Sequence, residues 1–446
     1  MAMSVAETVA AAKTGHVRYS VVAMLFAVTV INYADRATLS LAGPAVSKEL
    51  GLNPVSLGIV FSAFAWTYVI AQIPGGWLLD RYGSRMVYFT SLILWSVFTL
   101  LQGTVALFGA TLAIPVLFAL RALVGAAEAP SFPANSRIVA AWFPAHERGT
   151  AAAIFNSAQY FATVLFAPLM GLIITVLGWP WVFYTMGALG IAMGGLWLVV
   201  IHDPLRHPRL GAAELQHMRD GGALVDIDRA TAAATAPGDT RPGWTEVKRL
   251  LQNRTFLGVC IGQYAISVLT YFFLTWFPVY LVQQRGMSIL NAGLVASLPA
   301  LCGFFGGVLG GLFSDALFRR GVSLTWARKI PIVAGLLMST SMILCNYVET
   351  QWVIVVVMAI AFLGKGIGAL GWAVVSDIAP RRMIGLSGSI FNTFGNVAGI
   401  TTPIIIGVLV QGTGSFDGAL VFVGANAVAA VLSYLLIVGE IRRLEV

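Results

Sequence analysis

The stretch that is most informative about the fold lies at the end of an apolar run and reads Gly75-Gly76-Trp77-Leu78-Leu79-Asp80-Arg81-Tyr82-Gly83-Ser84-Arg85. A partial copy follows in the second half, where Gly310-Gly311 precedes Asp315. Further pairs match at the same offset of 235–236 residues: Ile154-Phe155-Asn156 with Ile390-Phe391-Asn392, Pro144 with Pro380, Gly149 with Gly385, and Pro168 with Pro403. An ordered series of matches at one offset indicates two halves built on one plan.

The composition is that of a membrane protein. Of the 446 residues, 58% are hydrophobic and 10% are charged, and the mean hydropathy is +0.84. A soluble domain has about a quarter charged residues, whereas a membrane-spanning helix needs about 20 predominantly apolar ones. We therefore predict an all-α polytopic membrane protein. Its twelve spans are expected at 19–42, 55–79, 86–107, 111–136, 147–177, 180–201, 254–282, 289–313, 328–347, 351–376, 383–409 and 416–438. The third and fourth runs are nearly continuous, so eleven or thirteen spans are the alternatives.

The predicted domains are two six-helix bundles, 1–201 and 254–446, joined by a polar linker at 202–253. Two related halves with a site between them near the midplane are a recurring design of secondary transporters. Under this model 22 of the 27 Lys and Arg residues lie on the side of both termini, which predicts that the termini are cytoplasmic. This bias explains the pI of 9.6, so no nucleic-acid partner is expected. We expect a short amphipathic linker helix at 212–221, and solvated side chains at His202, His207 and His217.

Five charged residues lie inside predicted spans: Asp35, Arg36, Arg121, Glu128 and Lys365. Charges within a bilayer are costly and usually face a bundle interior or a wet cavity, where they pair or bind something. Adjacent residues on a helix project about 100° apart, so Asp35 and Arg36 need partners elsewhere. A purely structural Asp-Arg pair is the alternative. Arg121 and Glu128, seven residues apart, share one helix face.

Lys365 places a cation in the second half, near the middle of the tenth predicted span. It lies roughly 16 Å from the cytoplasmic end, which is too far for easy snorkelling. A substrate with a carboxylate at each end would then lie between Arg36, which offers a planar fork, and Lys365. The alternative is a lysine in a wet vestibule without substrate contact.

The stretch from Gly75 to Arg85 resembles the loop signature of the major facilitator superfamily, and the resemblance extends over nearly the whole chain. The second copy departs from the pattern, with Arg319-Arg320 in place of the Arg-x-Gly-x-Arg ending. The resemblance implies that the loop gates the cytoplasmic side without touching substrate. The alternative is a charge that only sets topology. The gate residues would be Gly76, Asp80, Arg81, Gly83 and Arg85.

Three other stretches resemble the anion:cation symporter branch of that superfamily: Asn32-Tyr33-Ala34-Asp35-Arg36, Arg121 to Pro133, and Phe362 to Asp377. The third resembles glucarate/galactarate transporters, whereas galactonate transporters typically lack the lysine. The resemblance implies that Asp35 and Glu128 carry protons, with Arg121 in the coupling network. It implies a substrate pocket formed by Tyr33, Arg36, Tyr68, Gln159, Gln263, Lys365, Trp372 and Asn392.

We therefore predict a monomeric inner-membrane symporter that imports an acidic sugar, an aldarate such as D-glucarate or galactarate, with protons as the coupling ion and no other cofactor or metal. The five intramembrane charges sum to +1 when ionised and to +3 when both carboxylates are protonated, so proton uptake favours a dianion. No histidine lies in a predicted span, which leaves carboxylates to carry protons; residue type alone leaves sodium open. The alternatives are a symporter of a monocarboxylate sugar acid, such as galactonate or a hexuronate, and a non-transporting membrane sensor. An enzyme is not expected, because the sequence shows no nucleophile–base pair, metal cluster or phosphate loop.

Overall fold

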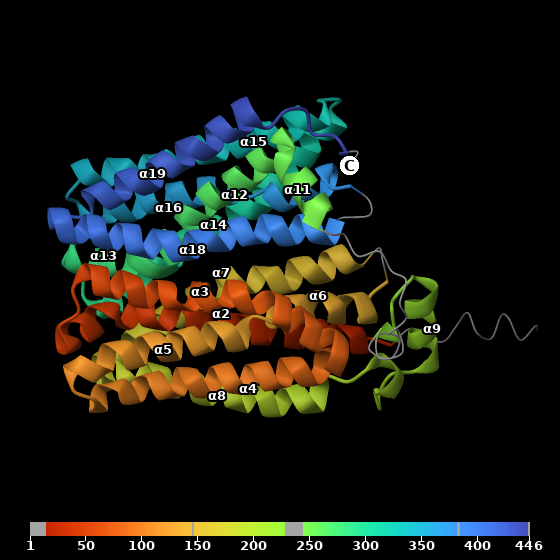
Figure 1. Cartoon of the computed structure of the whole chain (residues 1–446), viewed down its shortest axis with the longest axis horizontal. Helices are drawn as coiled ribbons and strands as arrows, with labels where there is room; N and C mark the ends of the chain where they lie inside the picture. The colour runs from red at the N-terminus through yellow and green to blue at the C-terminus, as the bar shows by residue number, and fades with distance from the viewer. Residues whose placement is uncertain (1–14, 145–146, 228–243, 381–383, 445–446) are drawn as a thin grey trace, which may run out of the picture.

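The structure is a computed structural model that describes residues 15–144, 147–227, 244–380 and 384–444, and within these ranges it contains helices and no strand (Figure 1). The α-helices are α2 (Val17–Leu50), α3 (Pro54–Tyr82), α4 (Ser84–Gln102), α5 (Ala110–Glu128), α6 (Ser131–Trp142), α7 (Arg148–Leu177), α8 (Pro180–Val200), α9 (Ala212–Asp220), α11 (Trp244–Gln252), α12 (Arg254–Tyr271), α13 (Phe277–Gln283), α14 (Ile289–Arg319), α15 (Leu324–Ser339), α16 (Gln351–Ile367), α17 (Gly371–Ile378), α18 (Ile384–Thr413) and α19 (Asp417–Leu432). Short 3₁₀-helices lie at Gly103–Leu107, Pro204–Arg206 and Thr340–Tyr347. Short π-helices lie at Phe272–Trp276 and Ser433–Ile437.

Twelve helical stretches in the described part of the chain are long and apolar enough to cross a membrane, which confirms the predicted number and the all-helical fold. The third and fourth are separate, at Ser84–Leu107 and Leu112–Trp142. Three spans contain two α-helices each: α5 and α6 form the fourth, α12 and α13 the seventh, and α16 and α17 the tenth. The first helix continues eight residues beyond its predicted end and stops at Gly51, whose φ of 67° suits glycine. Residue 383, the predicted start of the eleventh span, lies outside the described residues.

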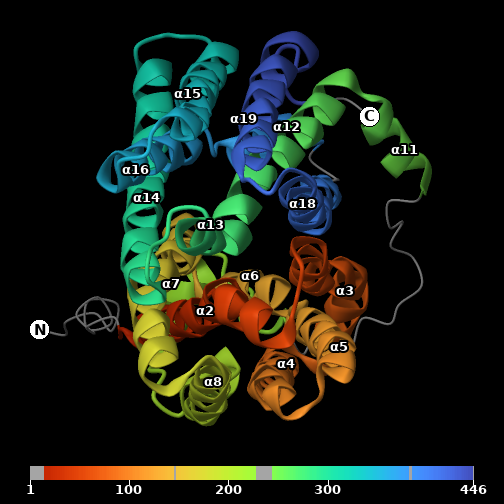
Figure 2. The same ribbon diagram turned by 90° about the vertical axis from the view of Figure 1, so that its left-hand side faces the viewer.

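The helices form two groups (Figure 2). Helices α2 to α8 lie together in one group, and α12 to α19 lie in the other. The groups approach closely where α3 meets α18. A Cβ at Gly58 would lie 2.3 Å from the Pro403 carbonyl oxygen, and one at Gly407 would lie 2.5 Å from that of Pro54. Glycine at both positions therefore lets the two backbones touch. The domain boundaries at 201 and 254 stay a prediction.

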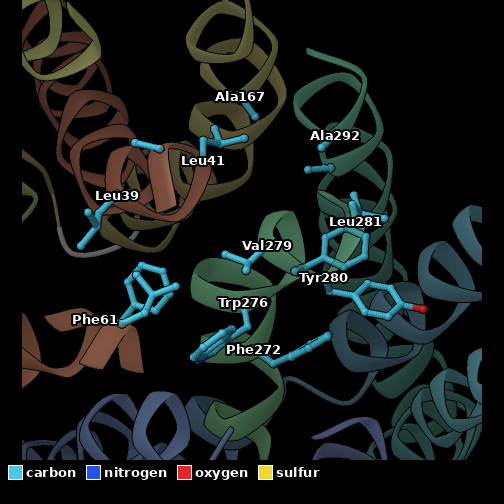
Figure 3. Close-up of a cluster of buried hydrophobic side chains, with 14 of the residues drawn as sticks. Leu39, Leu41, Phe61, Ala167, Phe272, Trp276, Val279, Tyr280, Leu281 and Ala292 are labelled. Atoms are coloured by element: carbon cyan, nitrogen blue, oxygen red, sulfur yellow. The ribbon is translucent and has the colours of Figure 1, made fainter. Parts of the chain in front are cut away.

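The two groups share one hydrophobic core, near α13 at the end of the molecule opposite the C-terminus (Figures 1 and 3). Phe61 of the first group packs edge-on against Trp276 of the second, with ring centroids 5.4 Å apart. Beside them, the Ser40 hydroxyl donates to the Thr275 carbonyl at 2.7 Å. Of two other buried clusters, one combines the first group with part of the linker, and the other combines the second group with α11. Apolar packing therefore joins the halves at the end away from the termini.

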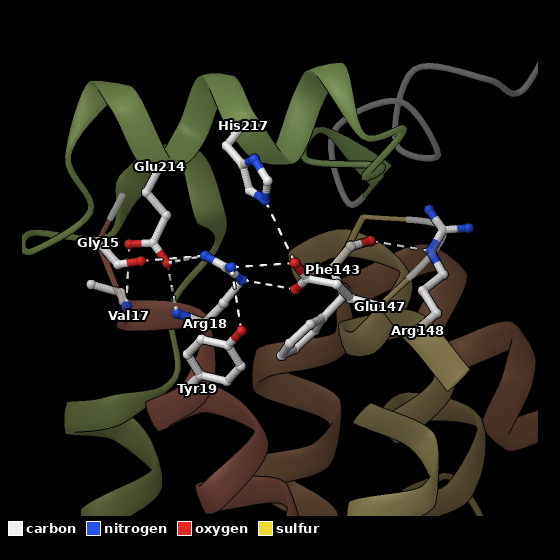
Figure 4. A network of polar contacts seen from close by, with 9 residues as sticks. All are labelled: Gly15, Val17, Arg18, Tyr19, Phe143, Glu147, Arg148, Glu214 and His217. Carbon is white, nitrogen blue, oxygen red and sulfur yellow. Dashed lines mark hydrogen bonds and ion pairs between the residues drawn. The ribbon is translucent and has the colours of Figure 1, made fainter. Parts of the chain in front are cut away.

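The beginning of the linker packs onto the first group (Figure 4), and α9 confirms the predicted linker helix. Glu214 is buried and accepts hydrogen bonds from the backbone N–H groups of Val17 and Arg18, both at 3.2 Å. Arg18 in turn binds Glu147 at 3.0 Å, and His217 lies 3.5 Å from the same carboxylate. Partial burial works to raise the pKa of Glu147, but the hydrogen bond and charge of Arg18 outweigh it and lower that pKa.

The linker histidines correct one expectation. His207 is not a solvated side chain, because the chain after α8 folds back and places it edge-on against Trp142, with ring centroids 5.3 Å apart. Burial lowers the pKa of His207. His217 is partly exposed, as expected, but it lies at ion-pair distance from Glu147. The sequence showed no apolar periodicity that would have predicted this contact.

Candidate substrate and proton site

Arg36 pairs with Glu128 in the interior of the first group. Both side chains are buried, and Arg36 Nε donates to Glu128 Oε1 at 2.5 Å, while Nη2 approaches the same oxygen. Glu128 is the last residue of α5, where the chain turns at Pro130 before α6 begins. The partner of Arg36 therefore comes from another helix, as its position beside Asp35 requires.

Aromatic rings surround the Arg36 guanidinium. Its Cζ lies 4.9 Å from the ring centroid of Tyr33, 4.8 Å from that of Phe64 and 5.0 Å from that of Tyr68. Ring faces attract a cation without occupying its N–H donors. The cage thus fixes the guanidinium while leaving its donors available for carboxylates. Tyr68, predicted as a substrate residue, lies in this cage.

Asp35 and Arg121 lie beside the ion pair. Asp35 is 1% exposed, and neither of its oxygens has a hydrogen bond of ordinary geometry to the described residues. The charges that act on it are those of Glu128 and Arg121. Arg121 is also buried, and its Nε and Nη1 have no hydrogen-bond partner in the described part of the chain. The three predicted proton-coupling residues thus form one buried charged group, which Arg36 completes.

A cavity lies between the two groups of helices and is partly open to solvent; its empty space is about 700 Å³ when the open solvent is included. Tyr33 of α2 and Gln159 of α7 line it from the first group, and Lys365 of α16 lines it from the second. Lys365 is 5% exposed, and its Nζ lies 5.1 Å from the Phe362 ring centroid. Arg36 is not among the lining residues; Tyr33, whose ring it contacts, separates it from the cavity. The structure therefore brings Lys365, Tyr33 and Gln159 to one cavity and places Arg36 directly behind its wall.

The other predicted substrate residues lie away from this cavity. Gln263 Nε2 lies 3.4 Å from Ser267 Oγ on the same helix, and Trp372 is 52% exposed, its ring 4.9 Å from Phe391. Asn392 offers its backbone carbonyl to Asn396 Nδ2 at 3.0 Å. Their roles as substrate ligands stay predictions.

Two tyrosines of the site were missed. Tyr160 lines the cavity, and Lys365 Nζ lies 5.9 Å from its ring centroid. The Tyr271 hydroxyl donates a hydrogen bond to Asn396 Oδ1 at 3.1 Å. Tyr271 also interacts electrostatically with Arg36 and Glu128 of the other group. A signal for Tyr271 exists in the sequence: polar residues recur every fourth position along α12, at Gln263, Ser267 and Tyr271, and so share one face.

Two of the predicted gate residues, Arg81 and Arg85, contact their own group of helices. Gly83 has a φ of 78° between α3 and α4, a conformation that favours glycine. Arg81 Cζ lies 5.5 Å from the Trp77 ring centroid, and Arg85 Nη2 donates to the Leu198 carbonyl at 2.7 Å. A Cβ at Gly76 would meet open space. The side chain of Asp80 lies outside the described residues, and the gating role of the loop stays a prediction.

Next to the second copy of the loop, Arg328 of α15 connects two carboxylates. It binds Asp377 at 2.9 Å and lies 3.5 Å from Asp315, the repeat equivalent of Asp80. These contacts remain within the second group.

Residues 25–403 match the family model described as the Major Facilitator Superfamily. The chain belongs to this superfamily. It is 60% identical over 433 residues to the "Probable galactarate/D-glucarate transporter GudP" of Bacillus subtilis, covering 97% of this chain and 94% of the relative. It is 56% identical over 441 residues to the "Probable galactarate/D-glucarate transporter GarP" of Escherichia coli K12, covering 98% and 99%. A "D-galactonate transporter" of Escherichia coli O6:H1 is 42% identical, with 97% and 98% covered.

Solved structures share the fold of this major facilitator. A D-xylose-proton symporter aligns with a TM-score of 0.70 at 17% identity, covering 95% of this chain and 98% of that one. A bacterial homolog of the human lysosomal transporter Spinster aligns with a TM-score of 0.72 at 16% identity, covering 94% and 96%. The predicted family is confirmed, together with the likeness to glucarate/galactarate transporters. The curated relatives are transporters rather than enzymes.

Proposed function

We propose that this transporter is a monomeric inner-membrane symporter that imports an aldarate dianion, D-glucarate or galactarate, together with protons. Support comes first from its relatives: those at 56–60% identity are named as probable galactarate/D-glucarate transporters, whereas the galactonate transporter is 42% identical. The proposal includes cytoplasmic termini, in agreement with the distribution of lysine and arginine.

The observation that carries the dicarboxylate is the position of Lys365. It is a cation in the cavity wall of the second group, and the cation of the first group, Arg36, contacts Tyr33, which lines the same cavity. A buried ammonium needs an anionic or hydrogen-bonding partner. A diacid provides one carboxylate for Lys365 and another for Arg36, so each end of the substrate is neutralised by a different half of the transporter.

Proton coupling follows from competition for Arg36. This side chain carries one positive charge and binds Glu128, so it cannot neutralise both Glu128 and a substrate carboxylate. Protonation of Glu128 removes the competitor and leaves the guanidinium donors to the substrate. Linkage then requires substrate binding to promote proton uptake by the same factor. Asp35 is the second proton site, held beside Arg121.

Alternating access fits the same arrangement. The shared core at Phe61 and Trp276 joins the halves at the end away from the termini. If the termini are cytoplasmic, this contact lies on the extracellular side and closes it. The cavity is then the one from which substrate is released into the cell. Rocking of the halves about the central site would open the other side.

A monocarboxylate sugar acid is the second candidate, favoured by the 42% identity to a D-galactonate transporter over nearly the full length. In that case Arg36 binds the single carboxylate and Lys365 makes no substrate contact.

Uptake of labelled D-glucarate into proteoliposomes, with and without an imposed inward proton gradient, tests the proposal. We expect the gradient to drive accumulation, and unlabelled galactarate to compete more strongly than galactonate. Uptake that is indifferent to the gradient would refute the coupling. Stronger competition by the monoacid would replace the dicarboxylate with the second candidate. Protein-free liposomes provide the baseline.

A further inference from the structure

Buried polar side chains continue from Asp35 along one face of α4, away from the substrate cavity. They are Trp95, Thr99 and Gln102, spaced four and three residues apart and therefore on the same side of the helix. Trp95 and Gln102 are 0% exposed and Thr99 is 1% exposed. The Trp95 indole N–H approaches the Asp35 carboxylate. Together the four residues form what we call the α4 polar column.

Every member of the α4 polar column has a polar atom without a hydrogen bond of ordinary geometry to the described residues. These atoms are both carboxylate oxygens of Asp35, Trp95 Nε1, Thr99 Oγ1 and Gln102 Oε1. An unsatisfied buried polar group is destabilising, and internal water is its usual partner in a polar interior. Such atoms on one face of α4, beginning next to Asp35 of α2, indicate a path that water can enter.

The column runs toward the end of the molecule away from the termini. Helix α4 begins at Ser84, after the loop predicted to be cytoplasmic, and Gln102 is its last residue. Leu107, five residues later, is 82% exposed. None of the four column residues lines the substrate cavity. In the proposed orientation, the column therefore extends from Asp35 toward the extracellular side, along a direction that the substrate cavity does not share.

We propose that the α4 polar column is the proton entry path to Asp35, an inference that rests on the proposed proton coupling. A proton enters the water chain at its outer end, each water passes one proton inward, and Asp35 gains one O–H bond. The Thr99 hydroxyl can both accept and donate, so it can belong to the relay; the Trp95 indole only donates, so it orients water. The charged groups that act on Asp35 are Glu128 and Arg121 of α5: the negative charge of Glu128 attracts the arriving proton, and the positive charge of Arg121 opposes it.

Thr99→Val and Gln102→Leu, made separately, remove polar atoms from the path while keeping approximate size. Thr99→Ser retains the hydroxyl. The matched control is Ser96→Ala: Ser96 is also buried on α4, but its hydroxyl already donates to the Leu92 carbonyl at 2.6 Å. Each variant is reconstituted, and two rates are measured: uptake driven by a proton gradient, and exchange of labelled for unlabelled D-glucarate at equal pH. Exchange needs no net proton movement.

We expect Thr99→Val and Gln102→Leu to slow gradient-driven uptake severalfold and to leave exchange unchanged, with Thr99→Ser and Ser96→Ala close to wild type in both rates. Normal driven uptake in both path variants would overturn the inference. An equal fall in exchange, or a fall in Ser96→Ala, would also overturn it, because either result indicates general damage to the helix. Wild-type uptake without any gradient dependence would refute the proposed coupling itself, so the two failures are distinguishable.

Discussion

Replacing Lys365 by methionine removes a single charge from the cavity while preserving the length of the side chain. Lys365 is 5% exposed and lies against the rings of Phe362 and Tyr160, surroundings that suit a thioether as well as a lysine stem. The cavity should keep its shape. The variant therefore measures the attraction between the ammonium group and the second carboxylate of a diacid.

The size of the effect follows from that attraction. Two unit charges about 4 Å apart interact by about 4 kcal/mol at an effective dielectric constant of about 20, before desolvation is subtracted. Hydrogen bonds to charged groups contribute about 1.5–3 kcal/mol net. Since about 1.4 kcal/mol corresponds to a factor of ten, the dissociation constant for D-glucarate should rise roughly 10- to 150-fold. The affinity for a monoacid such as D-galactonate should change little.

Ligand-induced thermal shifts on purified protein, titrated with each acid, measure the two dissociation constants. Lys329→Met is the matched control, because Lys329 is also a buried lysine of the second group but donates to the Val438 carbonyl at 2.6 Å and lies away from the cavity. An equal loss for diacid and monoacid, or no loss for the diacid, would show that Lys365 does not bind the second carboxylate.

Three other perturbations test the coupling site, the helix packing and the linker. Glu128→Gln keeps the side-chain shape but carries no charge, so accumulation driven by a proton gradient should disappear while exchange at equal pH continues; retained accumulation would exclude Glu128 as a proton site. Gly306→Ala places a Cβ 2.2 Å from the Leu363 carbonyl oxygen and should cost about 1–3 kcal/mol, seen as a lower thermal midpoint, whereas Gly311→Ala meets nothing within 4 Å and should not. Because burial lowers the pKa of His207, the unfolded chain takes up this proton at a higher pH than the folded one, and stability should fall as the pH drops below the ordinary value of 6.5. The fall in thermal midpoint between roughly pH 7.5 and 5.5 should be smaller in His207→Gln, and an identical fall would contradict this assignment.

Hydropathy and charge alone determined the architecture. A bilayer-spanning helix must be apolar over its whole length, so span number can be counted along the chain. The same reasoning isolated Asp35, Arg36, Arg121, Glu128 and Lys365, because a charge in an apolar run is costly wherever the helix packs. All five are buried in the folded protein. The repeat offset likewise predicted two related halves without any knowledge of their contacts.

Only the tertiary structure decided which of these groups meet. Arg36 and Glu128 are 92 positions apart, and their pairing depends on how α2 packs against α5. In the second group, helix packing places Lys365 in the cavity wall and leaves Gln263 and Trp372 outside it. His207 is buried only because the linker folds back on Trp142. The sequence alone shows that a polar group lies among apolar residues, where it is costly. The partner that offsets this cost comes from a distant helix, and helix packing determines which residue it is.

Under the proposed function, substrate selection depends on the relative position of the cations on the two sides of the central cavity, and not on summed charge alone. Each half contributes one of these cations. In the folded protein Lys365 lies in the cavity wall, whereas Arg36 lies behind the Tyr33 ring and binds the Glu128 carboxylate. Glycine where α3 meets α18 lets the two halves approach closely, because side-chain volume at those points would hold them apart.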